Sequence, residues 1–380
     1  MKRHLLVTND FPPKVGGIQS YLWELWSRLD PDSFEVLTAT SHPDASEFDA
    51  EQARHGFRIQ RIPGKTLYVP TAGSVRRVAT MAKEMGAGLV VIDPAVPLGV
   101  MGPFVGVPFA VVLHGAEVTV PARIPVSRTV LSQVLGHARL VISAGGYPAA
   151  EGARIAGRRM PAVVEIPPGV DCERFAPLDE PARAAARRRL GLPESGLLVA
   201  SVSRLVPRKG MDVLIEAVRR LRTSFPDLTL AIAGGGRQEG ELAEQVRRSG
   251  AGILLGRIGE PEKAMLLGAA DVFAMACRTR WLGLEQEGFG IVFMEAAASG
   301  VPQVAGTSGG AAEAVEDGET GVVVRRPGDP GAVAEALRKL LVDPALRRRM
   351  GVAARRRAVG SFDYARLAPR LAEALSEYGA

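Results

Sequence analysis

A chain of 380 residues is too long for one typical domain and fits two domains of ordinary size. Its hydrophobic content of 47% can supply two cores, and its formal charge of +6 comes mostly from arginine, since only seven of the 47 basic residues are lysine. The two cysteines imply no disulfide framework and favour a reducing cytoplasm. The apolar run at the N-terminus is too short for a signal peptide, and no stretch approaches the roughly 18 apolar residues that span a bilayer. Any membrane contact is therefore expected to be peripheral.

The first half of the chain alternates short apolar segments with helical ones, which is typical of a parallel, doubly wound α/β sheet. Strands are predicted at 4–8, 35–40, 57–61, 89–92, 109–113, 140–143 and 163–168, and helices at 17–29 and 75–85. The helix at 75–85 carries Arg76, Arg77 and Lys83 opposite an apolar side. This pattern fits a helix packed on the sheet, and it also fits a helix that lies against anionic lipid.

The same alternation starts again after the prolines at 167 and 168. Strands are predicted at 197–203, 228–234, 253–255, 272–274, 303–305 and 321–324, and helices at 210–222, 239–249 and 364–378. The sequence therefore predicts two successive Rossmann-like α/β domains. A cleft between two such domains is a preferred place for a ligand.

The most informative motif is E-G-F-G-I-V-F-M-E, in which Glu287 and Glu295 stand eight residues apart. Gly288 and Gly290 precede the apolar helix, and glycines there let backbone N–H groups approach an anion at a helix N-terminus. Eight residues make about two helical turns, so both carboxylates can face one ligand. A phosphate site between two carboxylates suits a sugar nucleotide, because carboxylates accept hydrogen bonds from hydroxyl groups. The alternative is a charged surface helix that follows a glycine turn.

Three further motifs follow predicted strands, where ligands bind in open α/β sheets. Gly16 and Gly17 lie between the first strand and a helix, in the outline of a phosphate-binding loop. His114 comes directly after the strand at 109–113. Arg204 and Lys209 follow the first strand of the second half, and two cations there would stabilise a diphosphate. Taken alone, these residues also fit an ordinary turn, a structural histidine and a solvated basic loop.

These motifs occur in the order that is found in the retaining nucleotide-sugar glycosyltransferases of family four, which have the two-domain B-type fold. The resemblance extends over nearly the whole chain and rests on T-N-D-F-P-P-K-V-G-G-I-Q-S-Y-L at 8–22, L-H-G-A-E-V at 113–118, P-P-G-V-D-C-E-R-F at 167–175, S-R-L-V-P-R-K-G at 203–210 and the motif that begins at Glu287. The wording is similar to that of the actinobacterial phosphatidylinositol mannoside mannosyltransferases that use GDP-mannose.

The resemblance implies an acceptor-binding domain at 1–168, a nucleotide-sugar-binding domain at 169–360, and a C-terminal helix within 361–380 that packs back on the first domain. It implies four catalytic residues, in which His114 and Glu287 position the transferred sugar and Arg204 and Lys209 stabilise the diphosphate. Arg208 matches no role in the family pattern. The substrate-binding positions that the resemblance implies are Gly16, Gly17, Arg257, Ile258, Gly288, Phe289, Gly290, Ile291, Val292 and Glu295.

The expected reaction moves a hexose, mannose from GDP-mannose, to a phosphatidylinositol mannoside-type lipid with retention at the anomeric carbon and without a side-chain nucleophile. No cofactor, metal or nucleic acid is expected, and the protein is expected in the cytoplasm, peripheral on the inner face of the plasma membrane. One alternative is the same fold with another nucleotide sugar and a soluble or polysaccharide acceptor, and another is a sugar-nucleotide 2-epimerase-like enzyme. A nicotinamide-dependent oxidoreductase is less compatible, because the sequence lacks G-x-G-x-x-G followed by an acidic residue.

Overall fold

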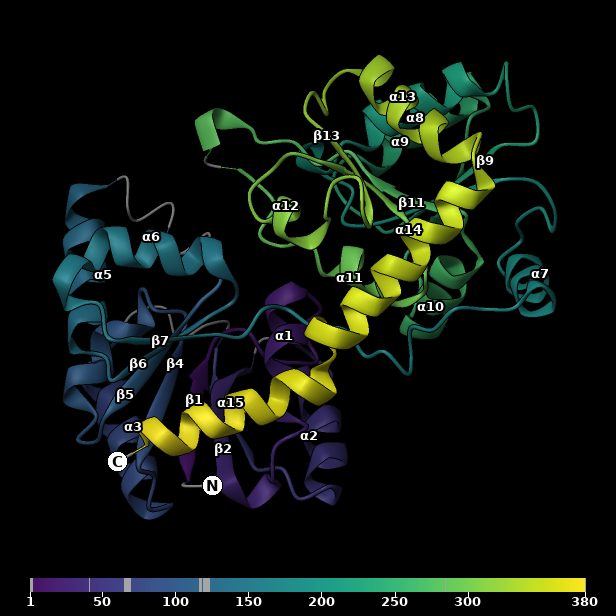
Figure 1. Ribbon diagram of the computed structural model, residues 1–380. Coiled ribbons are helices and arrows are strands. Elements are labelled where there is room, and N and C mark those ends of the chain that lie inside the picture. The colour runs from purple at the N-terminus through teal and green to yellow at the C-terminus, as the bar shows by residue number, and fades with distance from the viewer. Residues whose placement is uncertain are drawn as a thin grey trace. The chain divides into compact units, whose positions relative to one another are not determined.

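The computed structural model describes residues 3–40, 42–64, 70–115, 118, 124–283 and 285–379. The chain divides into two compact units. Unit 1 comprises Met1–Pro168 and Tyr364–Ala380, and unit 2 comprises Gly169–Asp363. Each unit is built on its own parallel sheet with helices packed against it (Figure 1), which confirms the expected pair of doubly wound α/β domains.

Within its described residues, unit 1 holds a seven-stranded parallel sheet. In spatial order its strands are β3 (Ile59–Pro63), β2 (Phe34–Thr40), β1 (His4–Thr8), β4 (Leu89–Asp93), β5 (Phe109–Leu113), β6 (Leu140–Ser143) and β7 (Ala162–Glu165). The last strand was predicted to reach residue 168 but ends at Glu165. Pro167 and Pro168 follow closely, and proline cannot donate a hydrogen bond to a sheet.

Helices cover both faces of the unit 1 sheet. On one face lie α3 (Ala72–Glu84), the 3₁₀ segment η2 (Leu98–Phe104), α5 (Pro125–His137) and α6 (Gly146–Ala156), and on the other lie α1 (Gly17–Trp26), α2 (Ala45–Arg54) and α15 (Tyr364–Tyr378). Successive strand residues serve the two layers in turn: Leu5 and Val7 join the first, and Leu6 joins the second. Such strands are buried on both faces and therefore read as continuous apolar runs.

Two predicted helices of unit 1 differ from the observed ones at an end. The helix predicted at 17–29 ends at Trp26. The helix predicted from residue 75 begins three residues earlier, at Ala72, because Thr71 caps it. The Thr71 hydroxyl accepts from the Ser74 N–H at 3.1 Å, and the Ser74 hydroxyl accepts from the Thr71 N–H at 2.8 Å, which is a reciprocal capping box.

In unit 2 the described residues form a six-stranded parallel sheet. Its strands, in spatial order, are β10 (Ile253–Gly256), β9 (Thr229–Ala233), β8 (Leu198–Val202), β11 (Val272–Met275), β12 (Gln303–Gly306) and β13 (Gly321–Val324). Its longer helices are α7 (Glu180–Arg189), α8 (Met211–Leu221), α9 (Glu239–Ser249), α10 (Glu260–Ala269), α11 (Ile291–Ala298), α13 (Pro330–Leu341) and α14 (Pro344–Arg357). Because β8 lies between β9 and β11, the loops after these three strands emerge at one edge of the sheet.

Helix α15 returns the chain to unit 1 after unit 2 is complete. It packs against α1, and its buried Leu367, Leu371 and Leu375 join the core that lies on that face of the sheet. The helix spans the residues that its apolar spacing predicted.

Candidate functional site

The carboxyl edge of the unit 2 sheet brings Lys209 and Glu287 together. Lys209 ends the short segment η5 (Pro207–Lys209) after β8, and its Nζ lies 2.7 Å from Oε2 of Glu287 in the loop before α11. Both side chains are less than a tenth exposed. Gly210 makes the turn between Lys209 and α8 with φ of 70°. A Cβ there would lie 2.1 Å from the carbonyl oxygen of Ala276. Only glycine fits that turn, so its backbone fixes where the ammonium lies.

A second loop holds Glu287 from the other side. The Glu287 N–H donates to Oγ of Ser308 at 3.0 Å, and the Gly310 N–H donates to the Glu287 carbonyl at 3.1 Å. Gly309 has φ of 51°, and a Cβ there would lie 2.0 Å from the same carbonyl oxygen. The loop after β12 therefore fits closely around the backbone of Glu287 because it carries two glycines. These residues were not predicted from the sequence, although Gly309 and Gly310 form a glycine pair after a strand, as Gly16 and Gly17 do.

Arg208 also belongs to this cluster, although it matches no role in the family pattern. Its Nε lies 4.0 Å from Glu287, and its Nη1 lies 3.7 Å from Glu285. That Nε is buried and has no hydrogen-bond partner among the described residues. Glu285 also pairs with Arg280 at 3.0 Å and with Arg237 at 3.8 Å. One carboxylate thus collects three guanidinium groups at the edge of the sheet.

The charges of this cluster favour an anionic ligand. Arg208, Lys209, Arg237 and Arg280 carry four positive charges against the two negative charges of Glu285 and Glu287, which leaves two in excess. A diphosphate diester carries about two negative charges, and charge-assisted hydrogen bonds from such groups are the strong ones. The arrangement is suited to hold a diphosphate and to stabilise charge that develops on it.

The loops that follow β8, β9 and β10 lie beside one another. The Leu205 N–H, next to exposed Arg204, donates to the Gly235 carbonyl at 3.0 Å. Gly234 has φ of 133°, and a Cβ there would lie 1.8 Å from the carbonyl oxygen of Ser203. A Cβ on Gly235 would lie 2.8 Å from Nε of Arg257, so that guanidinium covers the glycine loop.

Ile258 comes next and packs, partly buried, against the unit 2 core.

Glu295 pairs with a different lysine from the one that pairs with Glu287. Its Oε1 accepts from Nζ of Lys263 at 2.7 Å, and Lys263 also lies 2.8 Å from Glu260 and over the ring of Phe175. Burial raises the pKa of Glu295, and the charge of Lys263 opposes that shift. Burial alone would lower the pKa of Lys263, but the charges of Glu295 and Glu260 outweigh it and raise that pKa. That Glu287 and Glu295 face one ligand stays a prediction.

The segment between the two glutamates forms the start of α11. Gly290 caps the helix with φ of 82°, a left-handed conformation that favours glycine. Phe289 is buried and its ring lies 5.8 Å from that of Phe362, while Ile291 and Val292 are partly buried and Gly288 is exposed. The first N–H groups of a helix have no partner within the helix, so this turn offers donors beside the cluster described above.

In unit 1 a buried chain of hydrogen bonds ends on His114. Nε2 of His114 lies 2.7 Å from Oδ1 of Asp93, and Oδ2 of Asp93 accepts from the Thr8 hydroxyl at 2.7 Å. Thr8, Asp93 and His114 belong to or follow β1, β4 and β5, which are neighbours in the sheet. The ring of Tyr21 meets the imidazole edge-on at 5.2 Å, and its hydroxyl donates to the Ile166 carbonyl. Burial, with a smaller effect of Asp93, raises the pKa of Tyr21.

Gly16 caps α1 and Gly17 is its first residue, and Asp10 holds the segment around them. Oδ1 of Asp10 accepts from Nζ of Lys14 at 2.8 Å and from the side-chain amide of Gln19. Gly16 precedes α1 in an extended conformation, and its carbonyl accepts from the Ser20 N–H at 3.0 Å. A side chain on Gly16 would meet the Gln19 amide, so glycine leaves the backbone at this helix start accessible.

No group of three or more His, Cys, Asp or Glu residues in the described part of the chain could hold a metal ion. The expectation of a metal-free reaction stays a prediction. None of the helices formed by described residues is long and apolar enough to cross a membrane.

Known proteins resemble this chain in sequence and in fold. Residues 182–357 match the family model described as "Glycosyl transferases group 1". A GDP-mannose-dependent alpha-(1-6)-phosphatidylinositol monomannoside mannosyltransferase of Mycolicibacterium smegmatis is 41% identical over 379 residues, which cover 98% of each chain. A protein of the same name from Mycobacterium tuberculosis is 37% identical, over 99% of this chain and 98% of that one.

A similar fold occurs in the crystal structure of Anabaena Alr3699/HepE in complex with UDP-glucose. It superposes with a TM-score of 0.80 at 23% identity and covers 98% of this chain and 99% of that one. Together with the two parallel sheets, this likeness confirms the expected two-domain glycosyltransferase fold. The full-length sequence similarity confirms the family resemblance, and the chain belongs to the group 1 glycosyltransferases.

Proposed function

We propose that this chain is a retaining mannosyltransferase that moves mannose from GDP-mannose to a phosphatidylinositol mannoside-type lipid. The observation that carries the proposal is the 41% identity, over 98% of both chains, to a relative with that donor and acceptor in its name. The structural similarity to the Anabaena protein, at 23% sequence identity, supports the fold alone and does not identify the nucleotide base or the sugar.

In this proposal the carboxyl edge of unit 2 holds the donor. Lys209, Arg208 and exposed Arg204 bind the diphosphate, and N–H groups at the start of α11 add neutral donors. When the bond from the sugar to the diphosphate breaks, negative charge grows on the leaving oxygen. Cations that are already fixed by Glu285 and Glu287 stabilise this charge without having to reorganise. Glu287 also accepts hydrogen bonds from sugar hydroxyls.

Unit 1 is proposed to position the transferred sugar and the acceptor. An ionised carboxylate only accepts hydrogen bonds, so the contact with Asp93 places a proton on Nε2 of His114 and fixes the ring orientation. His114 then contacts the mannose, and the loop at Gly16 and Gly17 lies against the diphosphate or the acceptor. No side chain is proposed to attack the sugar; the leaving phosphate assists the acceptor hydroxyl on the same face.

A lipid acceptor requires reversible contact with a membrane, and the proposed contact is helix α3. Arg76, Arg77 and Lys83 are exposed on this helix, whereas Val78 and Met81 pack into the core beneath it. Each Lys or Arg near an anionic surface contributes about 1 kcal/mol, so three give transient docking. The protein is proposed to act on the cytoplasmic face of the plasma membrane.

The experiment supplies labelled GDP-mannose with phosphatidylinositol monomannoside in vesicles. Formation of a lipid that carries one more mannose, with the α configuration, is expected. Transfer only to soluble glycans would overturn the lipid acceptor, and release of an epimer or hydride exchange would overturn mannosyl transfer. A panel of nucleotides in thermal unfolding tests the donor separately, since GDP should stabilise the protein more than UDP or ADP.

Docking through α3 is tested by replacing Arg76, Arg77 and Lys83 with Ser. Sedimentation with phosphatidylinositol vesicles should weaken and should fade with salt, because exposed charges are screened. Unchanged sedimentation would contradict this part of the proposal.

A further inference from the structure

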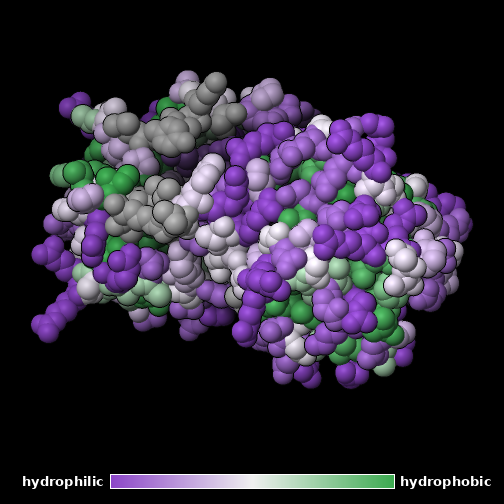
Figure 2. All heavy atoms as spheres, turned by 90° about the horizontal axis from the view of Figure 1, so that it is seen from above, coloured by the Kyte–Doolittle hydropathy of each residue, from purple (hydrophilic) through white to green (hydrophobic). Residues whose placement is uncertain are grey.

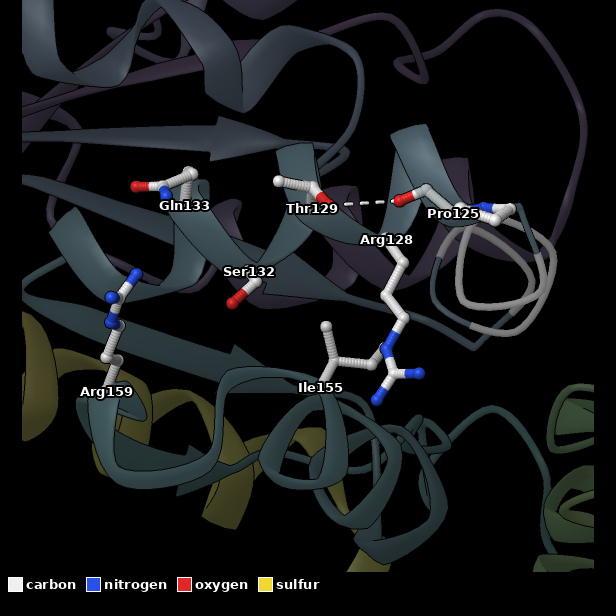
Figure 3. A pocket seen from close by; sticks show the side chains of 7 residues that line it. All are labelled: Pro125, Arg128, Thr129, Ser132, Gln133, Ile155 and Arg159. Carbon is white, nitrogen blue, oxygen red and sulfur yellow. Dashed lines mark hydrogen bonds between the residues drawn. The ribbon is translucent and has the colours of Figure 1, made fainter.

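A groove of about 500 Å³ opens on unit 1 between α5 and the segment made of α6 and η4 (Gly157–Arg159) (Figure 3). The guanidinium groups of Arg128 and Arg159 lie at its two ends, with the hydroxyl of Ser132 between them (Figure 3). Neither guanidinium has a side-chain hydrogen bond or ion pair among the described residues. Thr129 also lines the groove and donates its hydroxyl proton to the Pro125 carbonyl at 3.1 Å.

The surroundings of this groove are strongly positive. Residues 124–160 contain five arginines and one carboxylate, Glu151. That carboxylate is already paired with Arg154 at 2.8 Å. None of the described residues that line the groove is acidic. Two uncompensated guanidinium groups that face one cavity match the charge and the donor requirements of a phosphate group.

Gly136 of α5 leaves room for the side chain of Arg159. A Cβ on Gly136 of α5 would lie 3.3 Å from Cβ and 3.4 Å from Cδ of Arg159, so the aliphatic part of that arginine lies directly on the glycine. Glycine inside a helix costs roughly 0.5–1 kcal/mol relative to alanine. Here it allows the Arg159 side chain to lie along α5.

Two exposed apolar side chains flank the lining residue Pro125 in the sequence. Ile124 and Val126, at the start of α5, are 51% and 74% exposed. Phe104 of η2 is 68% exposed. Segment η2 contacts both α5 and the basic helix α3, on the same face of the sheet. On the face seen in Figure 2, hydrophobic side chains reach the surface in several places. Apolar side chains beside cations suit a surface that is charged outside and hydrocarbon within.

We propose that this groove binds the phosphate-bearing headgroup of an anionic phospholipid, which the positive charges of Arg128 and Arg159 at its two ends attract, while Ile124 and Val126 enter the headgroup region of the bilayer. The lipid bound here anchors the protein and is separate from the acceptor at the His114 site. The inference rests on the proposed function, because a lipid acceptor brings this face of unit 1 to a membrane.

The test compares two variants that lose the same charge. Arg128→Ser/Arg159→Ser empties the groove, and Arg139→Ser/Arg158→Ser removes two exposed arginines of the same segment that do not line it. Both are sedimented with vesicles of phosphatidylcholine alone and of equal parts phosphatidylcholine and phosphatidylinositol. The groove variant should lose about 30-fold in affinity for the second vesicles, from about fivefold for each arginine, and the control should stay within about threefold of wild type.

A third variant leaves the charge unchanged. Gly136→Ala displaces the stem of Arg159 and improves helix propensity, so it should weaken vesicle binding by about threefold without lowering the temperature of unfolding. Thermal unfolding with GDP shows for every variant that unit 2 is folded.

Several results would overturn the inference. Equal losses in the two arginine pairs would mean that only net charge matters. If the groove variant binds phosphatidylinositol vesicles as tightly as the wild type does, the groove is not the lipid-binding site. If inorganic phosphate binds to the groove but vesicles bind equally to the wild type and to the groove variant, the occupant is a soluble phosphate. A wild-type protein that binds vesicles through the groove but transfers no mannose would refute the proposed function and leave this inference standing. One that transfers mannose but ignores anionic vesicles would refute the inference alone.

Discussion

The two units of this protein place their functional side chains in the same way, at the carboxyl ends of parallel strands, but the chemistry at the two edges differs. In unit 1 a single buried carboxylate, Asp93, links Thr8 to His114. In unit 2 four cations surround two carboxylates, with Lys209 and Glu287 in contact. Topology decides where the side chains lie, and the sequence at each strand end decides what they can bind.

This difference assigns separate tasks to the units. The charged edge suits the diphosphate of a donor, and the hydrogen-bonded edge suits sugar and acceptor hydroxyls. It follows that changes at the unit 2 edge should alter charge stabilisation, whereas changes at the unit 1 edge should alter positioning and leave donor binding intact.

The largest effect is expected from Lys209→Ala. The variant leaves Glu287 with Arg208 alone and removes a cation that meets the growing charge on the diphosphate. Turnover should fall by roughly 10²-fold, which corresponds to about 3 kcal/mol of transition-state stabilisation. The measurement is steady-state mannosyl transfer. Lys339→Ala, an exposed lysine on α13, is the matched control and should behave as wild type. Near-normal turnover of the Lys209 variant would remove that residue from the site.

The next effect is expected from Asp93→Asn, at the other edge. The amide keeps the shape of the side chain but loses the charge that orients His114. A hydrogen bond to a charged group contributes about 2 kcal/mol, so turnover should fall about 30-fold. Stabilisation of the protein by GDP in thermal unfolding should be unchanged, because unit 2 is the unit that is proposed to hold the donor. A parallel loss of GDP stabilisation would contradict the division of tasks.

A smaller effect should follow Glu285→Gln, which removes the common partner of Arg208, Arg237 and Arg280. The excess positive charge grows while the orientation of the guanidinium groups is lost. The Kd of GDP is therefore expected to change by less than about threefold, whereas turnover should fall about tenfold. Glu335→Gln on α13 removes an exposed carboxylate that is paired with one arginine and serves as the control. If turnover is kept, Glu285 does not position the arginines.

The smallest effect is expected away from both edges, at Glu216 of α8. Hydrogen bonds from Arg219 and Arg220 hold the pKa of Glu216 at about 2, below its ordinary value of 4.5. The folded-state pKa is the lower one, so the pairing stabilises the protein above the unfolded pKa and is lost as pH falls towards 2. Since all three side chains are partly exposed, Glu216→Gln should cost only about 0.5 kcal/mol in the free energy of unfolding.

Denaturant unfolding at pH 7 and near pH 2 measures this difference, which should vanish at the lower pH. Turnover should be unaffected. A change in turnover as large as that of the Glu285 variant would show that surface charge in general, rather than the edge of the sheet, controls the reaction.

Most of the fold could be predicted from the sequence because strands buried on both faces are continuous apolar runs. The strand predicted at 57–61 lies at Ile59–Pro63 instead. Phe57 lies before this strand, and its ring packs edge-on against that of Trp23, with 5.4 Å between the ring centroids. The start of α3 was misplaced because its cap, Thr71, precedes the apolar pattern by several residues.

Lys209 and Glu287 could be singled out because each stands in a short motif of its own, and the structure brings the two side chains into contact. Their roles stay a prediction. Asp93 was missed, since its partners Thr8 and His114 lie 85 and 21 residues away and meet it only through the order of the strands. Glu285 was missed because a loop carboxylate has no periodic signal. It pairs with Arg280 of its own loop and with Arg208 and Arg237 of two others.

The position of α15 has a consequence for biosynthesis. A ribosome makes most of unit 1 before unit 2, but the unit 1 core on the α1 side also needs Leu367, Leu371 and Leu375, which follow all of unit 2. Until those residues emerge, the apolar surface beside α1 stays open to water and to other nascent chains. Domains generally fold as units during synthesis, with the N-terminal one first. Here the half that starts first can be completed only after the other half has been made.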